Sequence, residues 1–237
     1  MDGTGYEDLG FAQVDHDRLR RRGYPEAIYG AGKTLEEILA IGESLLRFGA
    51  SNVLVTRVSA ATLARLLDHF GDVELVPEAG LCVLKPVRRP GVGRITVVTS
   101  RPDDVPVALE AAHTAEAMGS LVERRFDAPM AEPERFPAWF ASLEPPRVIV
   151  VAQGGDGALA SVIAGLARCL VIAVPTSASS PWNGIPPVLA ALNSCVPGVV
   201  TVNIDNGFGA GYAAHLVNTG RERAATGGAR DTIAVSN

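Results

Sequence analysis

The sequence predicts an α/β protein in which a small N-terminal α/β module precedes a parallel sheet with helices on both faces. Three features of the 237 residues favour this class. Short β-branched runs alternate with helical segments, the runs beyond residue 91 are almost continuously apolar, and glycine or proline separates the elements. Continuous apolar runs of this kind are typical of parallel strands that are buried on both faces.

The first 90 residues divide into an arm and a module. Residues 1–23 are polar and show no sustained period, so they predict a poorly ordered arm with one short helix at most. Residues 24–90 predict strands at 27–30, 53–58, 73–77 and 81–86. A helix is expected to begin after Thr34, because Glu37 three residues later completes a capping box, and a second helix is expected over 61–70.

Residues 91–220 predict the larger domain, after a boundary marked by the RRPGVG segment. Strands are expected at 94–100, 121–127, 147–153, 169–177 and 199–204, and helices at 105–118, 136–143, 158–166, 188–194 and 210–217. Residues 221–237 predict a disordered tail. In such a sheet the ligand binds beyond the carboxyl ends of the strands, so the segments that follow the strands are the place to look for chemistry.

The composition excludes several classes of function. A net charge of -5 argues against a nucleic-acid surface, which needs clustered Lys and Arg, and the one dense basic run, at 18–22, is short. The apolar runs are too short to span a membrane, and no signal peptide is expected. Three widely spaced cysteines do not make a disulfide framework or a zinc site. We therefore expect a cytoplasmic protein that binds neither nucleic acid nor membrane.

The most informative of the segments after strands is QGGDG, at 153–157. Its backbone N–H groups at a strand-to-helix turn suit a phosphate or a developing anion. Asp156 could instead serve only as a helix cap, and the spacing leaves both interpretations open. The segment matches neither the dinucleotide-binding fingerprint nor the P-loop.

Two other carboxylates follow predicted strands. Asp103 and Asp104 form a pair that suits acid–base work or simply caps the next helix. Asp205, with Asn206 beside it, is either a turn former or a site acid.

The cysteines differ in their surroundings. Cys82 and Cys169 lie in strand-like runs and predict small core side chains. Cys195 follows Asn193 and Ser194 at the end of a predicted helix, where a sharp turn would hold it at a loop edge, so it is a candidate nucleophile. The four histidines show no metal-ligand spacing, so no structural metal is expected.

Several segments, taken in order, resemble the LarB family of pyridinium-3,5-biscarboxylic acid mononucleotide synthases. They are GYPEAIYGAGKT, HTAEAMG, VVAQGGDGALASVIAGL, IAVPTS and LNSCVPGVVTVNIDNGFGAGYAA. The similarity runs from about residue 23 to residue 217. The second domain is also similar to the PurE (aminoimidazole ribonucleotide, or AIR, carboxylase) domain, which implies a flavodoxin-type sheet.

The resemblance implies a reaction. The family carboxylates the pyridinium ring of nicotinic acid adenine dinucleotide, with CO2 or bicarbonate as co-substrate, and hydrolyses the phosphoanhydride to release AMP. Cys195 would add to the ring, Asp156 aligns with the family's glutamate as the general base, and Asp104 keeps a family acid. The resemblance implies no tightly bound cofactor, leaves Mg²⁺ open, and implies a homo-oligomer, an octamer. The residues predicted to bind substrate are Arg101, Asp103, Gly154, Gly155, Gly157, Ser177, Asn193, Ser194, Asp205 and Asn206.

The chain departs from the family pattern in three segments, which suggests a divergent paralogue. Arg101 replaces a glycine, Asp103 replaces a serine, Asp156 replaces a glutamate, and the loop after VPTS is shorter and carries Trp182. Two alternatives therefore stay open. One is a PurE-like carboxylase or mutase acting on an aminoimidazole ribonucleotide, and the other is a non-catalytic nucleotide-binding protein.

Overall fold

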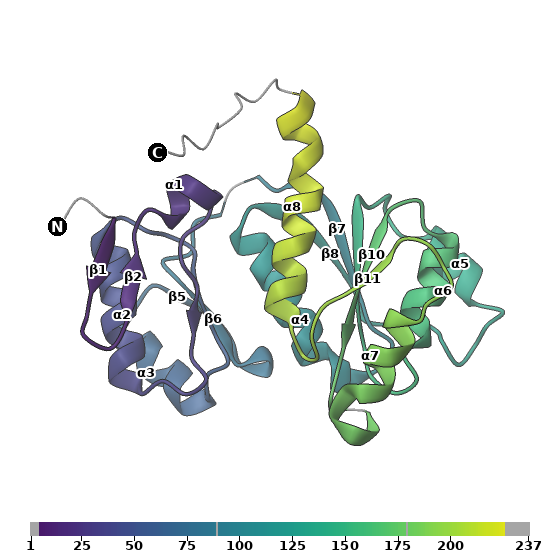
Figure 1. Cartoon of the computed structure of the whole chain (residues 1–237), viewed down its shortest axis with the longest axis horizontal. Helices are drawn as coiled ribbons and strands as arrows, with labels where there is room; N and C mark the ends of the chain where they lie inside the picture. Colours follow the sequence, from purple (N-terminus) through teal and green to yellow (C-terminus); the bar gives the residue numbers. More distant parts are fainter. Residues whose placement is uncertain (1–4, 89, 179, 226–237) are drawn as a thin grey trace, which may run out of the picture.

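The computed structural model describes residues 5–88, 90–178 and 180–225, and these residues form three sheets. A four-stranded sheet carries the N-terminal part of the chain and a five-stranded sheet carries the rest (Figure 1). The two parts lie side by side, and helices of the second part lie between the two sheets (Figure 1). Within the described ranges, no helix is both long and apolar enough to cross a membrane.

The start of the chain is more ordered than the sequence suggests. Instead of an arm, it forms an antiparallel pair, β1 (Tyr6–Asp8) with β2 (Gln13–Asp15), followed by α1 (Arg18–Arg22). Val14 is only 2% exposed and packs in the core of the N-terminal module. Strands of three residues are too short to show a period, which is why the pattern did not reveal them.

The N-terminal module has the expected strands and helices. Its sheet has the order β3-β4-β6-β5, with β3 and β4 parallel and the other pairs antiparallel. The capping box is present, because Thr34 Oγ1 accepts from the Glu37 N–H and Glu37 Oε2 accepts from the Thr34 N–H. The elements are β3 (Ile28–Tyr29), α2 (Leu35–Arg47), β4 (Val53–Thr56), α3 (Ala60–Phe70), β5 (Val73–Val76), the single turn η1 (Pro77–Ala79) and β6 (Leu81–Leu84).

The second sheet confirms the predicted class. All of its neighbouring strands are parallel, and they lie in the order β11-β10-β9-β7-β8. Numbered from the first strand of this sheet, the order reads 5-4-3-1-2, which is the flavodoxin-type order. The strands are β7 (Val92–Val98), β8 (Ser120–Arg125), β9 (Val148–Gln153), β10 (Leu170–Pro175) and β11 (Val199–Thr201).

Helices cover both faces of this sheet (Figure 1). On the face toward the N-terminal module lie α4 (Val105–Ala117) and α8 (Gly207–Ala225). The other face carries α5 (Phe136–Ala141), α6 (Ala158–Leu166) and α7 (Ile185–Leu192). Single turns precede two of these helices, η2 (Pro102–Asp104) before α4 and η3 (Pro181–Gly184) before α7.

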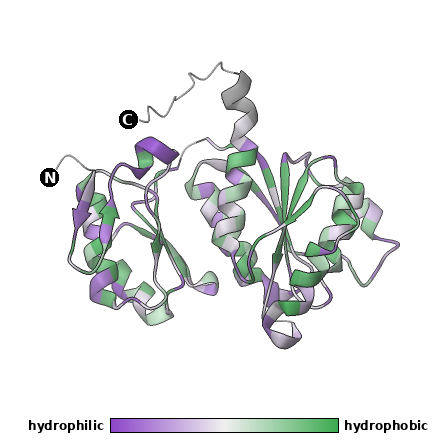
Figure 2. Ribbon diagram, viewed as in Figure 1, coloured by the Kyte–Doolittle hydropathy of each residue, from purple (hydrophilic) through white to green (hydrophobic). Residues whose placement is uncertain are grey.

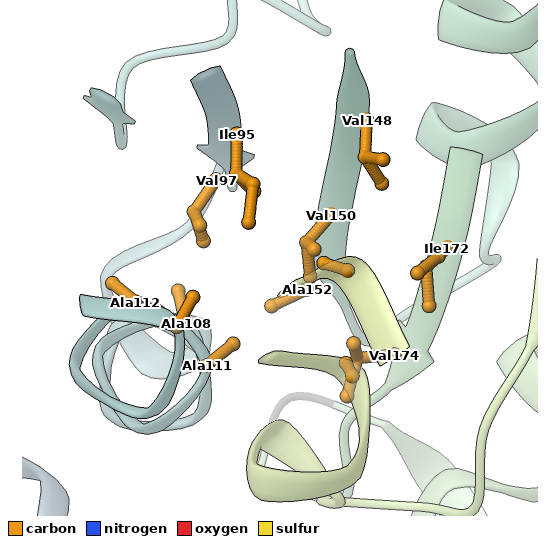
Figure 3. Close-up of a cluster of buried hydrophobic side chains, with 13 residues drawn as sticks. Ile95, Val97, Ala108, Ala111, Ala112, Val148, Val150, Ala152, Ile172 and Val174 are labelled. Carbon is orange, nitrogen blue, oxygen red and sulfur yellow. The ribbon is translucent and has the colours of Figure 1, made fainter. Parts of the chain in front are cut away.

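Along each strand, successive side chains point to opposite faces of the sheet. Val148 and Val150 point toward α4 and α8, where Ala108, Ala111 and Ala112 let the helix approach closely (Figure 3). Ile149 and its neighbours on the same face of the strand pack against α6 instead. The central strands β9 and β10 are buried on both faces and are almost entirely apolar (Figure 2), whereas the edge strand β8 ends in charged residues.

Two helices differ most in extent from the prediction. α7 begins at Ile185 rather than at residue 188, because the two prolines that follow occupy its first turn, where proline is tolerated. α8 runs from Gly207 to Ala225 rather than over 210–217, so part of the predicted tail is helical. Its glycine-rich start disfavours a helix in isolation, but a Cβ on Gly211 would lie 2.3 Å from the Ala111 carbonyl oxygen, so glycine permits the close contact with α4. The remaining tail, 226–237, lies outside the described residues.

Candidate functional site

The segments that follow β7, β9, β10 and β11 meet at the carboxyl edge of the five-stranded sheet. The strand order reverses between β7 and β9, and in open α/β sheets ligands bind at such a point. The Thr176 N–H donates to the Gln153 carbonyl at 3.1 Å, which ties the segment after β10 to the end of β9. The expected clustering of these segments is therefore present.

Asp104 lies beneath this edge. It is fully buried, and its Oδ1 accepts a hydrogen bond from the Thr176 hydroxyl. Its side chain does not cap α4, which it precedes. The carboxylate that the sequence placed among the catalytic residues is therefore enclosed by protein and holds the segment after β10, rather than facing the solvent side of the edge.

The 153–157 turn presents an exposed carboxylate. Asp156 Oδ1 accepts from the Ala158 N–H at 3.1 Å and from Gln153 Nε2 at 3.4 Å, and the residue remains exposed. Both interpretations of Asp156 therefore have support, since it bonds the start of α6 and still meets solvent. Gly157 has φ 73, and a Cβ there would lie 2.8 Å from Pro187 Cα, so the turn also requires glycine for space.

Asp205 organises the segments after β10 and β11. Its carboxylate accepts from the Ser177 N–H at 2.8 Å and from the Ser177 hydroxyl at 2.6 Å. Asp205 has φ 55, an uncommon conformation for a residue other than glycine. The structure thus brings together two of the predicted substrate-binding residues, Ser177 and Asp205.

The other predicted residues at this edge have simpler surroundings. Asn206 Oδ1 accepts from the Gly209 N–H at 2.8 Å, which makes Asn206 the N-cap of α8. Arg101 and Asp103 are exposed and 3.8 Å apart, too long for a hydrogen bond. Gly154 is buried, and Gly155 has φ 61.

Cys195 lies on the flank of the sheet rather than at its carboxyl edge. Its neighbour Ser194 has its hydroxyl oxygen 2.8 Å from that of Ser161, so the end of α7 lies beside the α6 residue that is five positions beyond Asp156. Three residues after Cys195, Gly198 accepts from the Val171 N–H at the amino end of β10. Cys195 and Asp156 therefore share the α6–α7 side of the sheet. Asp156 lies at the carboxyl end of the strands, and Cys195 lies nearer their amino end.

The three thiols differ in their exposure to solvent. Cys195 is exposed and Cys169 is partly buried. Cys82 is fully buried in the N-terminal module, and burial raises the pKa of its thiol to about 12.

Asn193 closes the end of α7, because its Nδ2 donates to the Leu189 carbonyl at 2.9 Å.

Sequence reasoning missed two residues that support the site. Glu110, 4% exposed, accepts from the Thr56 hydroxyl and from Arg57 Nε. Arg57 also donates to the backbone carbonyl of Asp205. A glutamate inside the apolar run VPVALEAAH was the available signal, since a buried charge requires partners.

A separate cavity of about 540 Å³ lies between the two parts of the chain. Its walls include His113, Glu116 and Arg124 from the second domain and Glu74 and Arg88 from the first. None of the predicted site residues is among the described residues that line it. In the part of the chain that the structure describes, no group of three or more His, Cys, Asp and Glu residues is placed to hold a metal ion.

Comparison with known proteins identifies the family. Residues 6–86 match the LarB/PurE-like N-terminal domain, and residues 94–226 match the AIR carboxylase domain. The chain is also 35% identical over 218 residues to the uncharacterized protein MJ0165 of Methanocaldococcus jannaschii, covering 86% of this chain and 83% of that protein. The two domain matches support a carboxylase-related function. The order of the domains, the flavodoxin-type sheet and the LNSC and NIDNGFGA segments agree, and this chain belongs to the LarB family.

Proposed function

We propose that this protein carboxylates the pyridinium ring of a nicotinate adenine dinucleotide through a covalent adduct with Cys195, and hydrolyses the phosphoanhydride to release AMP. The observation that carries the proposal is the exposed thiol of Cys195, in the LNSC segment of a LarB-family chain. A cysteine with solvent access can meet a substrate, whereas Cys82 cannot.

The chemistry follows from the charge of the ring. The Cys195 thiolate adds to C4 of the pyridinium and forms a C–S bond. A π-electron pair of the ring moves onto the ring nitrogen and neutralises its positive charge. The resulting enamine attacks CO2 from C5. A base then removes the C5 proton, the C–S bond breaks, and the ring regains its aromatic cation with one carboxylate added. Covalent addition thus converts an electrophilic ring into a nucleophile.

Asp156 is the proposed base. Because Asp156 and Cys195 of one chain lie at different levels along the sheet, the scheme requires them to come from neighbouring copies of the protein. Its carboxylate is exposed and sits in a glycine turn whose backbone can approach a substrate closely. Ser177 and Asp205, joined by two hydrogen bonds, are proposed to bind the substrate at the same edge. Water cleaves the phosphoanhydride, with AMP and the carboxylated mononucleotide as products. The scheme uses CO2 or bicarbonate as co-substrate and no tightly bound cofactor, and it leaves Mg²⁺ open for the hydrolytic step.

Self-association is part of the proposal. The outer side of α7 exposes Ile185, Leu189 and Leu192, spaced so that they share one stripe, and α6 beside it exposes Val162 and Leu166. A second copy over this face would cover these side chains and exclude water from Cys195. The family resemblance implies an octamer, which analytical ultracentrifugation would measure directly.

One observation favours a second candidate function. The AIR carboxylase match covers residues 94–226, which include all of the five-stranded sheet except the first two residues of β7. A PurE-like carboxylase or mutase acting on an aminoimidazole ribonucleotide would use the same sheet edge but would not need Cys195.

Substrate profiling separates these functions. The protein would be incubated with ¹³C-bicarbonate and with nicotinic acid adenine dinucleotide, NAD or aminoimidazole ribonucleotide in turn, and the products analysed by mass spectrometry. Our proposal predicts ¹³C in a pyridine mononucleotide together with an equal amount of AMP. Labelling of the aminoimidazole alone would support the second candidate. Saturable dinucleotide binding without turnover of any of the three would contradict both and indicate a non-catalytic nucleotide-binding protein.

A further inference from the structure

We infer that Arg57, a residue of the N-terminal module, is a positioning residue for the substrate-binding segment that follows β11. It lies outside the domain that carries the proposed chemistry, yet its side chain reaches that domain's site. What the site binds rests on the proposed function, but the geometry of Arg57 does not.

Arg57 bridges the two parts of the chain. It follows β4, and its guanidinium donates to two acceptors in the second domain, the Asp205 backbone carbonyl through Nη2 and Glu110 Oε1 through Nε at 3.4 Å. Its backbone has φ 62, which a residue other than glycine adopts at a cost. The strained backbone thus places the side chain across the domain boundary.

Glu110 anchors this arrangement from inside the second domain. Its carboxylate is almost fully buried and accepts from two groups of the N-terminal module, the Thr56 hydroxyl and Arg57 Nε. It also lies against the start of α8, since a Cβ on Gly207 would be 2.8 Å from Glu110 Oε2. A helix N-terminus and a guanidinium both stabilise a carboxylate, so Glu110 holds Arg57 and the start of α8 in fixed positions.

Asp205 connects Arg57 to the candidate site. Its backbone carbonyl accepts from Arg57, its N–H donates to the Pro175 carbonyl at 2.8 Å, and its carboxylate accepts two hydrogen bonds from Ser177. Asp205 itself has φ 55, so its backbone also depends on surrounding contacts to keep this conformation. Without Arg57, the carboxylate would lose the support that fixes its direction toward Ser177.

A purely structural role for Arg57 predicts something different. In that case its loss would weaken the contact between the two parts and lower overall stability, with no specific effect on residues 203–207. A positioning role instead predicts local loosening of this segment in a chain that remains folded. The two roles are therefore separable by a local measurement.

Arg57→Gly is the informative variant, because glycine accepts the left-handed backbone and only the side chain is lost. Lys85→Gly is the matched control. Lys85 is an exposed cationic residue of the same module with φ 49, so this change also removes one positive charge and relieves a left-handed backbone. Arg57→Lys tests whether a cation alone restores the contact.

The first measurement is hydrogen–deuterium exchange in the ligand-free protein, alongside thermal unfolding. We expect Arg57→Gly to unfold within about 3 °C of Lys85→Gly, a difference of about 1 kcal/mol for a chain of this size. In Arg57→Gly, the amides of Ser177 and of residues 203–207 should exchange about tenfold faster than in either the wild type or Lys85→Gly. Exchange of these amides within twofold of the wild type would overturn the inference, as would equal acceleration in Lys85→Gly.

The second measurement is steady-state kinetics with nicotinic acid adenine dinucleotide. We expect kcat/KM to fall about tenfold or more in Arg57→Gly, mainly through KM, because the displaced residues are the ones proposed to bind substrate. Arg57→Lys should recover part of this loss. Should the wild type turn over no substrate, the proposed function fails while the exchange result still decides the role of Arg57.

Discussion

The Thr176 hydroxyl donates a hydrogen bond to the buried carboxylate of Asp104, across the end of the central strand β9. The two residues follow β10 and β7, the strands on either side of β9. This bond links the two segments that flank the point where the strand order reverses. Its strength should therefore affect both the stability of the domain and the shape of the candidate site.

Replacing Thr176 with valine removes the donor but keeps the shape of the side chain. We expect Thr176→Val to lower the free energy of unfolding by about 1–3 kcal/mol, because a buried carboxylate loses a hydrogen bond. Thr176→Ser keeps the hydroxyl and should cost less. Urea unfolding of the three proteins measures the difference, and equal stability of the valine variant and the wild type would show that the bond contributes nothing.

Substitutions of Asp156 test whether it acts as the base. We expect Asp156→Asn to reduce turnover of the dinucleotide by about 10²–10⁴-fold, because an amide cannot accept the C5 proton. Asp156→Glu keeps the carboxylate and should retain measurable turnover. Since Asp156 also bonds the Ala158 N–H, circular dichroism of both variants serves as the control for the start of α6. Turnover in Asp156→Asn equal to that of the wild type would remove Asp156 from the mechanism.

The repeated pattern of the second domain made most of its fold predictable. Each apolar β-branched run, such as that around Val150, became a strand of the parallel sheet, because a strand buried on both faces has no polar positions to interrupt it. The helix boundaries were less predictable. The glycines at the start of α8 disfavour a helix, but Gly207 and Gly211 both lie so close to α4 that a Cβ would not fit.

The candidate site was predictable where its residues follow strands in the chain. Asp156 and Asp205 were found in this way, since the carboxyl ends of parallel strands share one edge. The complete burial of Asp104 could not be foreseen, because it depends on Thr176 approaching from another strand. Arg57 was missed for the same reason, as nothing in the sequence near it shows that Asp205 lies within its reach.

The three cysteines should react in the order of their exposure. At pH 8, substoichiometric iodoacetamide is expected to alkylate Cys195 first and Cys82 last, because Cys82 is fully buried and its thiol pKa is raised to about 12. Peptide mass spectrometry identifies the labelled site, and Cys195→Ala is the control that should remove the fast phase. Early labelling of Cys82 would contradict the buried position of that side chain.

His113, in the wall of the cavity between the two parts, should make stability depend on pH. Burial, and then the nearby charge of Arg124, lower its pKa below the ordinary value of 6.5, while Glu116 and Glu74 act in the opposite direction. A histidine with a lowered pKa binds its proton more weakly in the folded state. The free energy of unfolding should therefore be highest above pH 6.5 and should fall as the pH decreases below it, by at most about 1.4 kcal/mol per pH unit.

The variant His113→Gln isolates this contribution. Urea unfolding at pH 7.5 and pH 5.5 should show a smaller decrease for the variant than for the wild type, because the other titrating groups are common to both. An equal decrease in the two proteins would show that His113 does not contribute to the pH dependence.

We propose that Cys195 forms a covalent adduct with the pyridinium ring on the way to carboxylation. The most direct test is the incorporation of ¹³C-bicarbonate into nicotinic acid adenine dinucleotide by the wild type and by Cys195→Ala, each verified as folded and assembled. We expect labelled product and AMP from the wild type, and no labelled product from Cys195→Ala above the rate without protein. Labelled product from Cys195→Ala at the wild-type rate would contradict the covalent mechanism.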